Sequence, residues 1–317
     1  MRIVIRLLVI AAIIVAGCKN RGPVKPKEII IFHAGSLSVP FKQLADEYEK
    51  KNPGIKIIRE AAGSLVCARK ITELKKPCDI IASADYLVIN ELLIPEYATW
   101  SIRFATNEIV IAFQEKSKYA ADIDSANWMD ILLRKDVTFS RSDPDSDPCG
   151  YRTVLTFKLA ERFYGKPGLA DKLVSKNRDF IRPKEVDLVA LVESNAVDYM
   201  FQYKSVAIQH DLKYIELPDE INLSDPSKND IYNSVSIDVA GSSPGSKITV
   251  KGEYINYSLS VLTEALNKKE AVDFISFLLG NAGMDIFRKN GQEPIVPFST
   301  EQPDLIPEEL QKYLSLK

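Results

Sequence analysis

Ser36 and Ser64 are the first candidates for chemistry, because each follows an apolar run and a glycine and precedes an amphipathic segment. This order predicts a buried strand, a tight turn and then a helix that begins near the serine. Free backbone N–H groups and a hydroxyl at a helix N-terminus can together hold an anion. Each serine alone is more simply explained as an ordinary helix cap. The repetition makes a pocket lined by both hydroxyls as good an interpretation as two unrelated caps.

A third candidate lies within Ser142–Arg152, which reads S-D-P-D-S-D-P-C-G-Y-R. Its two Asp-Pro steps favour extended or turned backbone, and a helix then opens at Cys149. Asp147 therefore falls just before a helix N-terminus. Ser36 and Ser64 have the same position in their own strand–turn–helix segments. A role as helix cap would by itself account for Asp147.

Composition limits the classes of function. The chain has 317 residues, 46% of them hydrophobic, which suits two lobes better than one small core. With 41 basic and 43 acidic residues the net charge is −2, which disfavours nucleic-acid binding. His33, His210 and four dispersed cysteines show no zinc spacing, so a His-based metalloenzyme is not expected. Cys67 and Cys78 are close enough in sequence for a disulfide, which spacing alone cannot establish.

The N-terminus has the pattern of a secretory signal. Two arginines precede the apolar Leu7–Val15, a run too short to span a bilayer stably, and Ala-Gly-Cys follows. A cysteine in this place resembles the lipobox of bacterial and archaeal lipoproteins; the alternative is a plain signal cleaved elsewhere or an uncleaved anchor. We expect residues 1–17 to be a signal peptide and residues 18–27 a polar tether. Lipidated Cys18 would then hold the mature protein at the outer face of the cell membrane.

Strand and helix patterns alternate along the rest of the chain, beginning with a strand at Glu28–His33 and a helix at Val39–Lys51. Short apolar strands separated by helices favour parallel β-α-β units with a ligand at the carboxyl ends of the strands. A strongly apolar strand at Asn107–Gln114 opens a second series. That series includes a predicted helix at Glu185–Glu193 and ends before the polar turn Ser224–Asn229.

Six segments together carry a resemblance to a known family. They are Phe32–Ser38, Ala61–Ile71, Asp147–Arg152, Gln202–Ala207, Leu217–Leu223 and Phe287–Ile295. These segments resemble the archaeal-type tungstate/molybdate-binding proteins of ABC importers, the WtpA branch beside bacterial ModA. Each segment is moderately specific, but the set occurs in order over essentially the whole mature chain and is highly specific.

The resemblance implies an α/β type II periplasmic-binding-protein fold with two lobes, each a mixed, mostly parallel sheet flanked by helices. We expect residues 28–106 and 224–317 to form lobe 1 and residues 107–223 to form lobe 2. It also implies a monomeric receptor without enzymatic activity or cofactor. This receptor would close around tungstate or molybdate and deliver it to an ABC permease and its ATPase.

The family's oxyanion-binding positions can be carried over one at a time. Ser36 and Ser64 would donate from hydroxyl and backbone N–H, Cys149 from its backbone N–H, and Tyr203 from its hydroxyl. All four are neutral hydrogen-bond donors, which suit a fully ionised dianion.

The archaeal branch adds two carboxylates, matched here by Asp147 and Glu220, although a shift of one residue would replace Glu220 by Asp219. Two ionised carboxylates repel a dianion unless their oxygens bind the metal itself and raise it from four- to six-coordinate. Sulfur and phosphorus would not accept such ligands, so the pair would also reject sulfate and phosphate.

Other interpretations remain open. The same scaffold could bind sulfate, phosphate or another small oxyanion. A secreted hydrolase would use Ser36 or Ser64 as nucleophile and need a base such as His33, but no G-x-S-x-G elbow is present. The interpretation as a purely structural lipoprotein would not explain the two serine turns. Arg152 and Lys204 could counter local negative charge, but they are rather expected to be solvated or to face helices.

Overall fold

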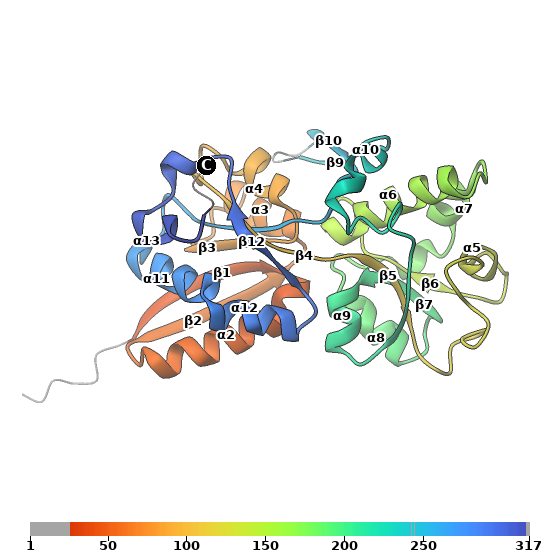
Figure 1. Cartoon of the computed structure of the whole chain (residues 1–317), viewed down its shortest axis with the longest axis horizontal. Helices are drawn as coiled ribbons and strands as arrows, with labels where there is room; N and C mark the ends of the chain where they lie inside the picture. The colour runs from red at the N-terminus through yellow and green to blue at the C-terminus, as the bar shows by residue number, and fades with distance from the viewer. Residues whose placement is uncertain (1–25, 242, 244, 315–317) are drawn as a thin grey trace, which may run out of the picture.

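The computed structural model describes residues 26–241, 243 and 245–314, and two main sheets organise them (Figure 1). The first sheet has the order β12 (Glu293–Ser299), β4 (Ile102–Thr106), β11 (Tyr257–Val261), β3 (Ile80–Ser83), β1 (Lys27–Ala34) and β2 (Ile55–Ala62). The second has the order β6 (Phe139–Ser140), β7 (Tyr199–Tyr203), β5 (Ile109–Phe113) and β8 (Lys213–Glu216). We call the first sheet with its helices lobe 1 and the second with its helices lobe 2.

Lobe 1 is built around β1, which lies between β2 and β3 and pairs with both in parallel. A strand flanked on both sides and covered on both faces carries a continuous apolar run, and Ile29 and Ile31 are fully buried. The parallel register places Ala34 opposite Ala62, so the turns that follow β1 and β2 lie side by side at one edge of the sheet.

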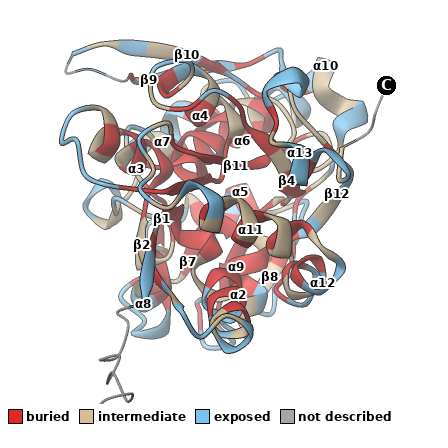
Figure 2. Ribbon diagram, turned by 90° about the vertical axis from the view of Figure 1, so that its left-hand side faces the viewer, coloured by how far each residue is buried: buried red, intermediate tan, exposed pale blue. Residues whose placement is uncertain are grey.

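Helices cover both faces of this sheet, and the buried residues lie between them (Figure 2). The helices of lobe 1 are α2 (Ser38–Lys51), α3 (Ser64–Thr72), α4 (Tyr86–Leu92), α11 (Lys268–Leu279), α12 (Asn281–Lys289) and α13 (Glu308–Gln311), with the 3-10 turns η1 (Gly35–Leu37) and η4 (Pro303–Leu305).

Lobe 2 has β5 near its centre, paired antiparallel with β7 and β8, while β6 pairs with β7 in parallel. Its helices are α5 (Trp128–Leu132), α6 (Pro148–Phe163), α7 (Leu169–Ser175), α8 (Asp187–Glu193) and α9 (Lys204–Gln209), with η2 (Arg178–Phe180). In both sheets the parallel and antiparallel pairs are mixed, since β11 and β12 in lobe 1 also pair antiparallel with their neighbours.

A small hairpin of β9 (Ser236–Ala240) and β10 (Lys247–Lys251) follows η3 (Pro226–Lys228) and α10 (Asn229–Tyr232). It lies against lobe 2, because Lys158 Nζ donates to the carbonyl of Ser236 over 2.5 Å and the N–H of Ala240 donates to Asp145 Oδ1 over 2.9 Å. This part of residues 224–317 therefore contacts lobe 2, although the sequence analysis assigned it to lobe 1.

The N-terminal predictions fall almost wholly outside the described residues, which begin at Pro26. The signal peptide at residues 1–17, the lipidated Cys18 and all but the end of the tether are in that segment. Within the part of the chain that the structure describes, no helix is long and apolar enough to cross a membrane.

Candidate functional site

The two serine turns lie where the sequence predicts them. Ser36 is in η1, directly after β1, and Ser64 is the first residue of α3, directly after β2. Both are fully buried. Because β1 and β2 are parallel neighbours, their turns come to the same edge of lobe 1.

Asp147 faces these turns from lobe 2. It caps α6, where Pro148 occupies the first helical position, as its fixed φ favours. The Asp147 side chain is fully buried, and its Oδ1 accepts a long hydrogen bond of 3.4 Å from the N–H of Cys149. The N–H of Cys149 thus points at the same place as the carboxylate.

Glu185 is the second carboxylate at this place, and the sequence analysis missed it. It is fully buried, and its Oε1 accepts a hydrogen bond from the N–H of Ser36 in the other lobe. A Cβ atom added to Gly35 would lie 2.8 Å from Glu185 Oε2, so a larger residue at position 35 would displace the Glu185 carboxyl. The Glu185 carboxylate therefore occupies the donor that the first serine turn offers to an anion.

Burial governs the charge of this pair. It raises the pKa of Asp147 well above its usual range, and the nearby charge of Glu185 raises it further. Burial also raises the pKa of Glu185, although hydrogen bonds from Ser36 oppose the shift. Asp147 Oδ2 and Glu185 Oε2 are both buried, and neither has a hydrogen-bond donor of good geometry among the described residues, although the two carboxyls lie close enough to interact with each other. Unused buried acceptors of this kind call for a ligand.

The hydroxyls of Ser64 and Tyr203 are both set up to donate. Ser64 Oγ accepts from the N–H of Ala84 over 3.0 Å, and the fully buried Tyr203 Oη accepts from Arg152 Nη1 over 2.9 Å. A hydroxyl whose oxygen already accepts still has its own proton to give. Both can therefore donate to an oxygen of a bound anion.

Arg152 is not solvated, contrary to the prediction, but is buried between the lobes. From α6 of lobe 2 it reaches the start of α4 in lobe 1, where Nη2 lies 3.0 Å from Asp85 Oδ2 and Nη1 donates to the carbonyl of Ala84 over 2.5 Å. Tyr151 also donates to Asp85 Oδ2, over 2.6 Å. Sequence reasoning missed this because the ion pair joins residues that are distant in the chain. Lys204, in contrast, keeps a partly exposed ion pair with Glu108.

The structure does not bring Glu220 to this group. The Glu220 side chain is 31% exposed and pairs with Lys228 over 2.9 Å, which lowers the pKa of Glu220. Its neighbour Asp219 instead accepts from Asn222 Nδ2 over 3.2 Å. Glu220 and Asp219 thus serve local contacts near the end of lobe 2.

A signal for Glu185 was present in the sequence. In a helix starting at Glu185, this residue would share a face with the apolar residues three, four and seven positions later. A carboxylate on the buried face of a helix needs a partner or a function. The helix α8 in fact begins at Asp187, which leaves Glu185 in the loop before it.

His33 lacks the geometry of a base for Ser36. Its Nδ1 donates to the carbonyl of Ala34 over 2.8 Å, and its ring stacks on Phe41 at 5.3 Å between centroids. Burial lowers the pKa of His33 to about 4. The side chain is a packed part of the strand end.

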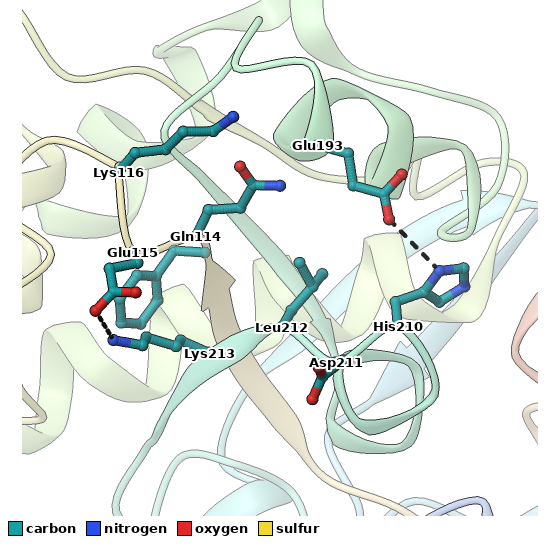
Figure 3. A pocket seen from close by; sticks show the side chains of 9 residues that line it. Gln114, Glu115, Lys116, Glu193, His210, Asp211, Leu212 and Lys213 are labelled. Carbon is teal, nitrogen blue, oxygen red and sulfur yellow. Dashed lines mark hydrogen bonds and ion pairs between the residues drawn. The ribbon is translucent and has the colours of Figure 1, made fainter.

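A large surface pocket lies elsewhere, on lobe 2, with a volume of about 600 Å³ (Figure 3). Two pairs of its charged residues lie together: Lys213 Nζ lies 3.0 Å from Glu115 Oε1, and His210 Nδ1 lies 3.8 Å from Glu193 Oε1. The pocket is open to solvent and has no buried ionisable group among the described residues that line it, so the buried carboxyl pair between the lobes is the stronger candidate.

Comparison with known proteins agrees with this geometry. Residues 29–293 match the family model described as bacterial extracellular solute-binding protein. An uncharacterised solute-binding protein of Petrotoga mobilis is 47% identical over 291 residues, 90% of each chain. The molybdate/tungstate-binding protein WtpA of Pyrococcus abyssi is 44% identical over 352 aligned residues, with all of both chains covered.

Among solved structures, the periplasmic molybdate-binding protein of Azotobacter vinelandii superposes with a TM-score of 0.62 at 16% identity. The match covers 85% of this chain and 99% of that one, and it confirms the predicted two-lobed α/β fold. The prediction that the chain is not an enzyme is also confirmed, since its relatives are transport proteins. The chain belongs to the family of bacterial extracellular solute-binding proteins.

Proposed function

We propose that this protein captures tungstate or molybdate between its lobes and delivers it to an ABC permease. The observation that carries the proposal is the pair of fully buried carboxyls, Asp147 and Glu185, facing the N–H donor of Ser36 from the opposite lobe. The name of the Pyrococcus abyssi relative, molybdate/tungstate-binding protein, agrees with it.

The neutral donors hold the oxygens of the anion. In this proposal the hydroxyls of Ser36, Ser64 and Tyr203 and the backbone N–H of Cys149 would donate to these oxygens. Hydrogen bonds from such donors are strengthened when the acceptor is charged. These groups alone would bind any small dianion, including sulfate.

The carboxylates supply the discrimination, with Glu185 in the role that the sequence analysis gave to Glu220. Asp147 Oδ2 and Glu185 Oε2 have no hydrogen-bond donor of good geometry among the described residues, and a bound metal centre would replace the contact that the two carboxyls make with each other. Hard carboxylate oxygens suit a hard, high-valent metal, which can expand its coordination from four to six. Sulfate and phosphate cannot do this and meet only repulsion.

Closure of the lobes completes the site. Contacts that join the lobes here include those of Ser36 with Glu185, of Arg152 with Asp85, and of Arg69 Nη2 with the carbonyl of Asp145 at 2.9 Å. A ligand that contacts both lobes binds the closed state better and shifts the population towards it. The permease would then recognise the closed, monomeric receptor, tethered to the outer face of the membrane by Cys18.

Calorimetric titration of the mature protein with tungstate, molybdate, sulfate and phosphate tests the proposal. We expect tight binding of at least one metal oxyanion and weak or no binding of sulfate and phosphate. Tight sulfate binding, or no binding of either metal oxyanion, would contradict it. Glu220→Ala is the matched control for Glu185→Ala, and only the Glu185 change should weaken binding.

A further inference from the structure

The hydroxyl of Ser36 is 2.9 Å from Tyr257 Oη, and either oxygen could be the donor. The direction matters, because it decides whether Ser36 offers its proton or a lone pair to a bound anion. Both residues are fully buried, so water cannot reorient the hydrogen bond freely.

Asn107 resolves the direction. Its Oδ1 lies 3.0 Å from the N–H of Glu108 and 3.3 Å from the N–H of Ser205, and both of these groups can only donate. The atom that faces them must therefore be the amide oxygen, which fixes the orientation of the side chain. Asn107 Nδ2 is then the donor that points to Ser205 Oγ at 2.7 Å and to Tyr257 Oη at 3.1 Å.

The remaining directions follow in sequence. Tyr257 Oη accepts from Asn107, and Ser36 Oγ is the only acceptor for its own proton among the described residues. A buried phenol proton without an acceptor is costly, so Tyr257 donates to Ser36 Oγ. Burial raises the pKa of Tyr257, so the phenol keeps that proton to give. Ser36 Oγ has then accepted a hydrogen bond, and its own proton turns to the side of the Glu185 carboxyl, where the anion would bind.

We infer that Asn107 is a positioning residue for ligand specificity, which acts through Tyr257 to hold the Ser36 hydroxyl as a donor. The inference rests on the proposed role of Ser36 as an oxyanion ligand. With Ser36 held as a donor, the site binds an anion whose oxygen at Ser36 carries no proton, and it rejects an anion that presents an O–H group to Ser36.

The place of Asn107 in the chain gives this arrangement its rigidity. Asn107 lies between β4 of lobe 1 and β5 of lobe 2, where the chain first crosses between the lobes. Tyr257 is the first residue of β11, and its ring lies 5.9 Å from that of Tyr203 between centroids. The donor direction of Ser36 is therefore set from the crossing point between the lobes, independently of Glu185.

The test is a double-mutant cycle of Asn107→Asp and Tyr257→Phe, with tungstate affinity measured by calorimetry. An aspartate at position 107 keeps the shape and accepts from Glu108 and Ser205, but it also accepts from Tyr257. Tyr257 then accepts a hydrogen bond from the Ser36 hydroxyl, and Ser36 turns a lone pair towards the anion. Loss of a hydrogen bond to a charged acceptor predicts an affinity about 10- to 100-fold lower.

The cycle separates this effect from simple charge repulsion. If Asn107→Asp reverses the Ser36 hydrogen bond through Tyr257, the loss of tungstate affinity that it causes should be at least about tenfold smaller in the Tyr257→Phe background than in the wild type. Equal losses in both backgrounds would overturn the inference. In the same titrations the preference for tungstate over hydrogenphosphate should narrow for Asn107→Asp, but not for Tyr257→Phe.

Two further measurements keep the result unambiguous. If Asn107→Asp fails to fold, Asn107→Ala enters the same cycle, because it removes the donor to Tyr257 without adding charge. A wild type that binds neither tungstate nor molybdate would overturn the proposed function, and with it the inference; if only molybdate binds, the same cycle is measured with molybdate. If the wild type binds the anion but the losses of affinity caused by the two substitutions simply add, the inference is overturned and the proposed function is not.

Discussion

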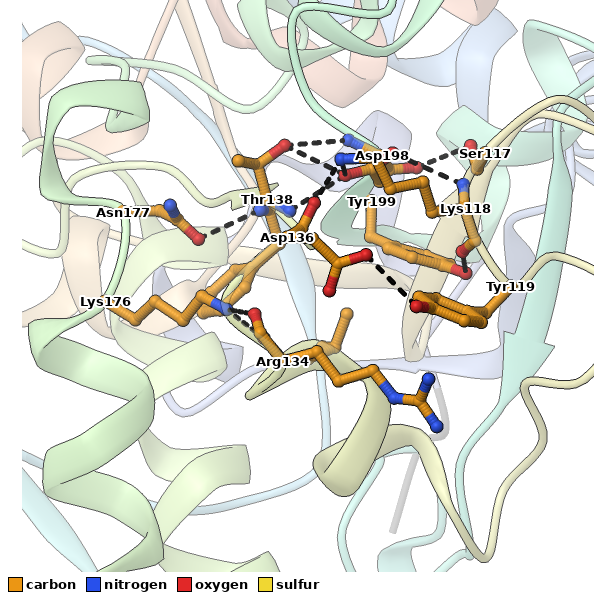
Figure 4. Close-up of polar contacts among 12 residues, drawn as sticks. Ser117, Lys118, Tyr119, Arg134, Asp136, Thr138, Lys176, Asn177, Asp198 and Tyr199 are labelled. Atoms are coloured by element: carbon orange, nitrogen blue, oxygen red, sulfur yellow. Dashed lines mark hydrogen bonds and ion pairs between the residues drawn. The ribbon is translucent and has the colours of Figure 1, made fainter.

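Two polar clusters in this protein are each built around buried or half-buried carboxylates, and they differ in how these are satisfied. In the cluster around Asp198 (Figure 4), Oδ2 accepts from the N–H of Thr138 at 2.8 Å and from its hydroxyl at 3.1 Å. Oδ1 accepts from the N–H of Lys118 at 3.3 Å. Both oxygens find their donors within lobe 2.

At the candidate site the pattern is reversed. Asp147 and Glu185 are more deeply buried, yet each keeps one oxygen that no described residue satisfies. The donor that Glu185 does have, the N–H of Ser36, belongs to the other lobe. A carboxylate that serves the fold is satisfied by its own surroundings, whereas one that serves a ligand keeps acceptors unused and depends on closure.

The largest expected effect comes from removing both carboxylates of the site. Asp147→Ala with Glu185→Ala should lower tungstate affinity by more than about 100-fold, because loss of supporting groups alone costs metal sites 10- to 100-fold. Calorimetry should also show a smaller ratio of tungstate to sulfate affinity. Unchanged selectivity would refute the role of the pair as metal ligands, and Glu220→Ala serves as the control.

Arg152→Met should have the next largest effect. It leaves Asp85 buried without its ion pair and removes the donor that orients the Tyr203 hydroxyl. Breaking a buried pair in this way costs about 3 kcal/mol. We expect tungstate affinity to fall by about 10- to 100-fold in calorimetry and small-angle scattering to show a more open ligand-bound form. Wild-type affinity with an equally compact form would contradict the account.

Asp198→Ala should lower the stability of the protein and leave its affinity for tungstate unchanged, which is the opposite of what the site variants should do. It leaves the donors of Thr138 and Lys118 without their acceptor, which should lower the free energy of unfolding by about 1–2 kcal/mol. Tungstate affinity should stay within about twofold of the wild type. Denaturant unfolding and calorimetry on the same preparation check both, and a selective loss of affinity would break the contrast between the two clusters.

The smallest effect concerns pH. Asp147 has a raised pKa in the folded protein, so its contribution to stability is present below its ordinary pKa of about 3.8 and is lost as pH rises through the folded value. Asp147→Asn keeps the helix cap but cannot ionise. Without ligand it should therefore be more stable than the wild type by about 1 kcal/mol at pH 8, with little difference at pH 4. Thermal unfolding at both pH values measures this, and a larger gain at pH 4 would contradict it.

Local patterns were sufficient to predict the part of the site that lies on strand–turn–helix units. Ser36, Ser64 and Asp147 each stand at such a junction, and the parallel pairing of β1 and β2 brings the two serines together. Glu185 could not be found in the same way, because a loop residue is placed by the docking of one lobe on the other.

The residues that orient the proposed ligand-binding hydroxyls could not be predicted, for a related reason. Arg152 and Tyr257 act through partners far away in the chain, Asp85 in the other lobe and Asn107 at the crossing between lobes. No periodicity or spacing connects such residues. Tyr203 is the last residue of β7, and the group that orients its hydroxyl, Arg152, became visible only in three dimensions.

X-ray absorption at the tungsten edge of the protein–tungstate complex tests the central claim most directly. The account predicts six oxygen neighbours, four from tungstate and two from the carboxylates of Asp147 and Glu185. The variant with both residues changed to alanine should show only the four oxygens of free tungstate. Four oxygens in the wild-type complex would contradict the claim that these carboxylates bind the metal.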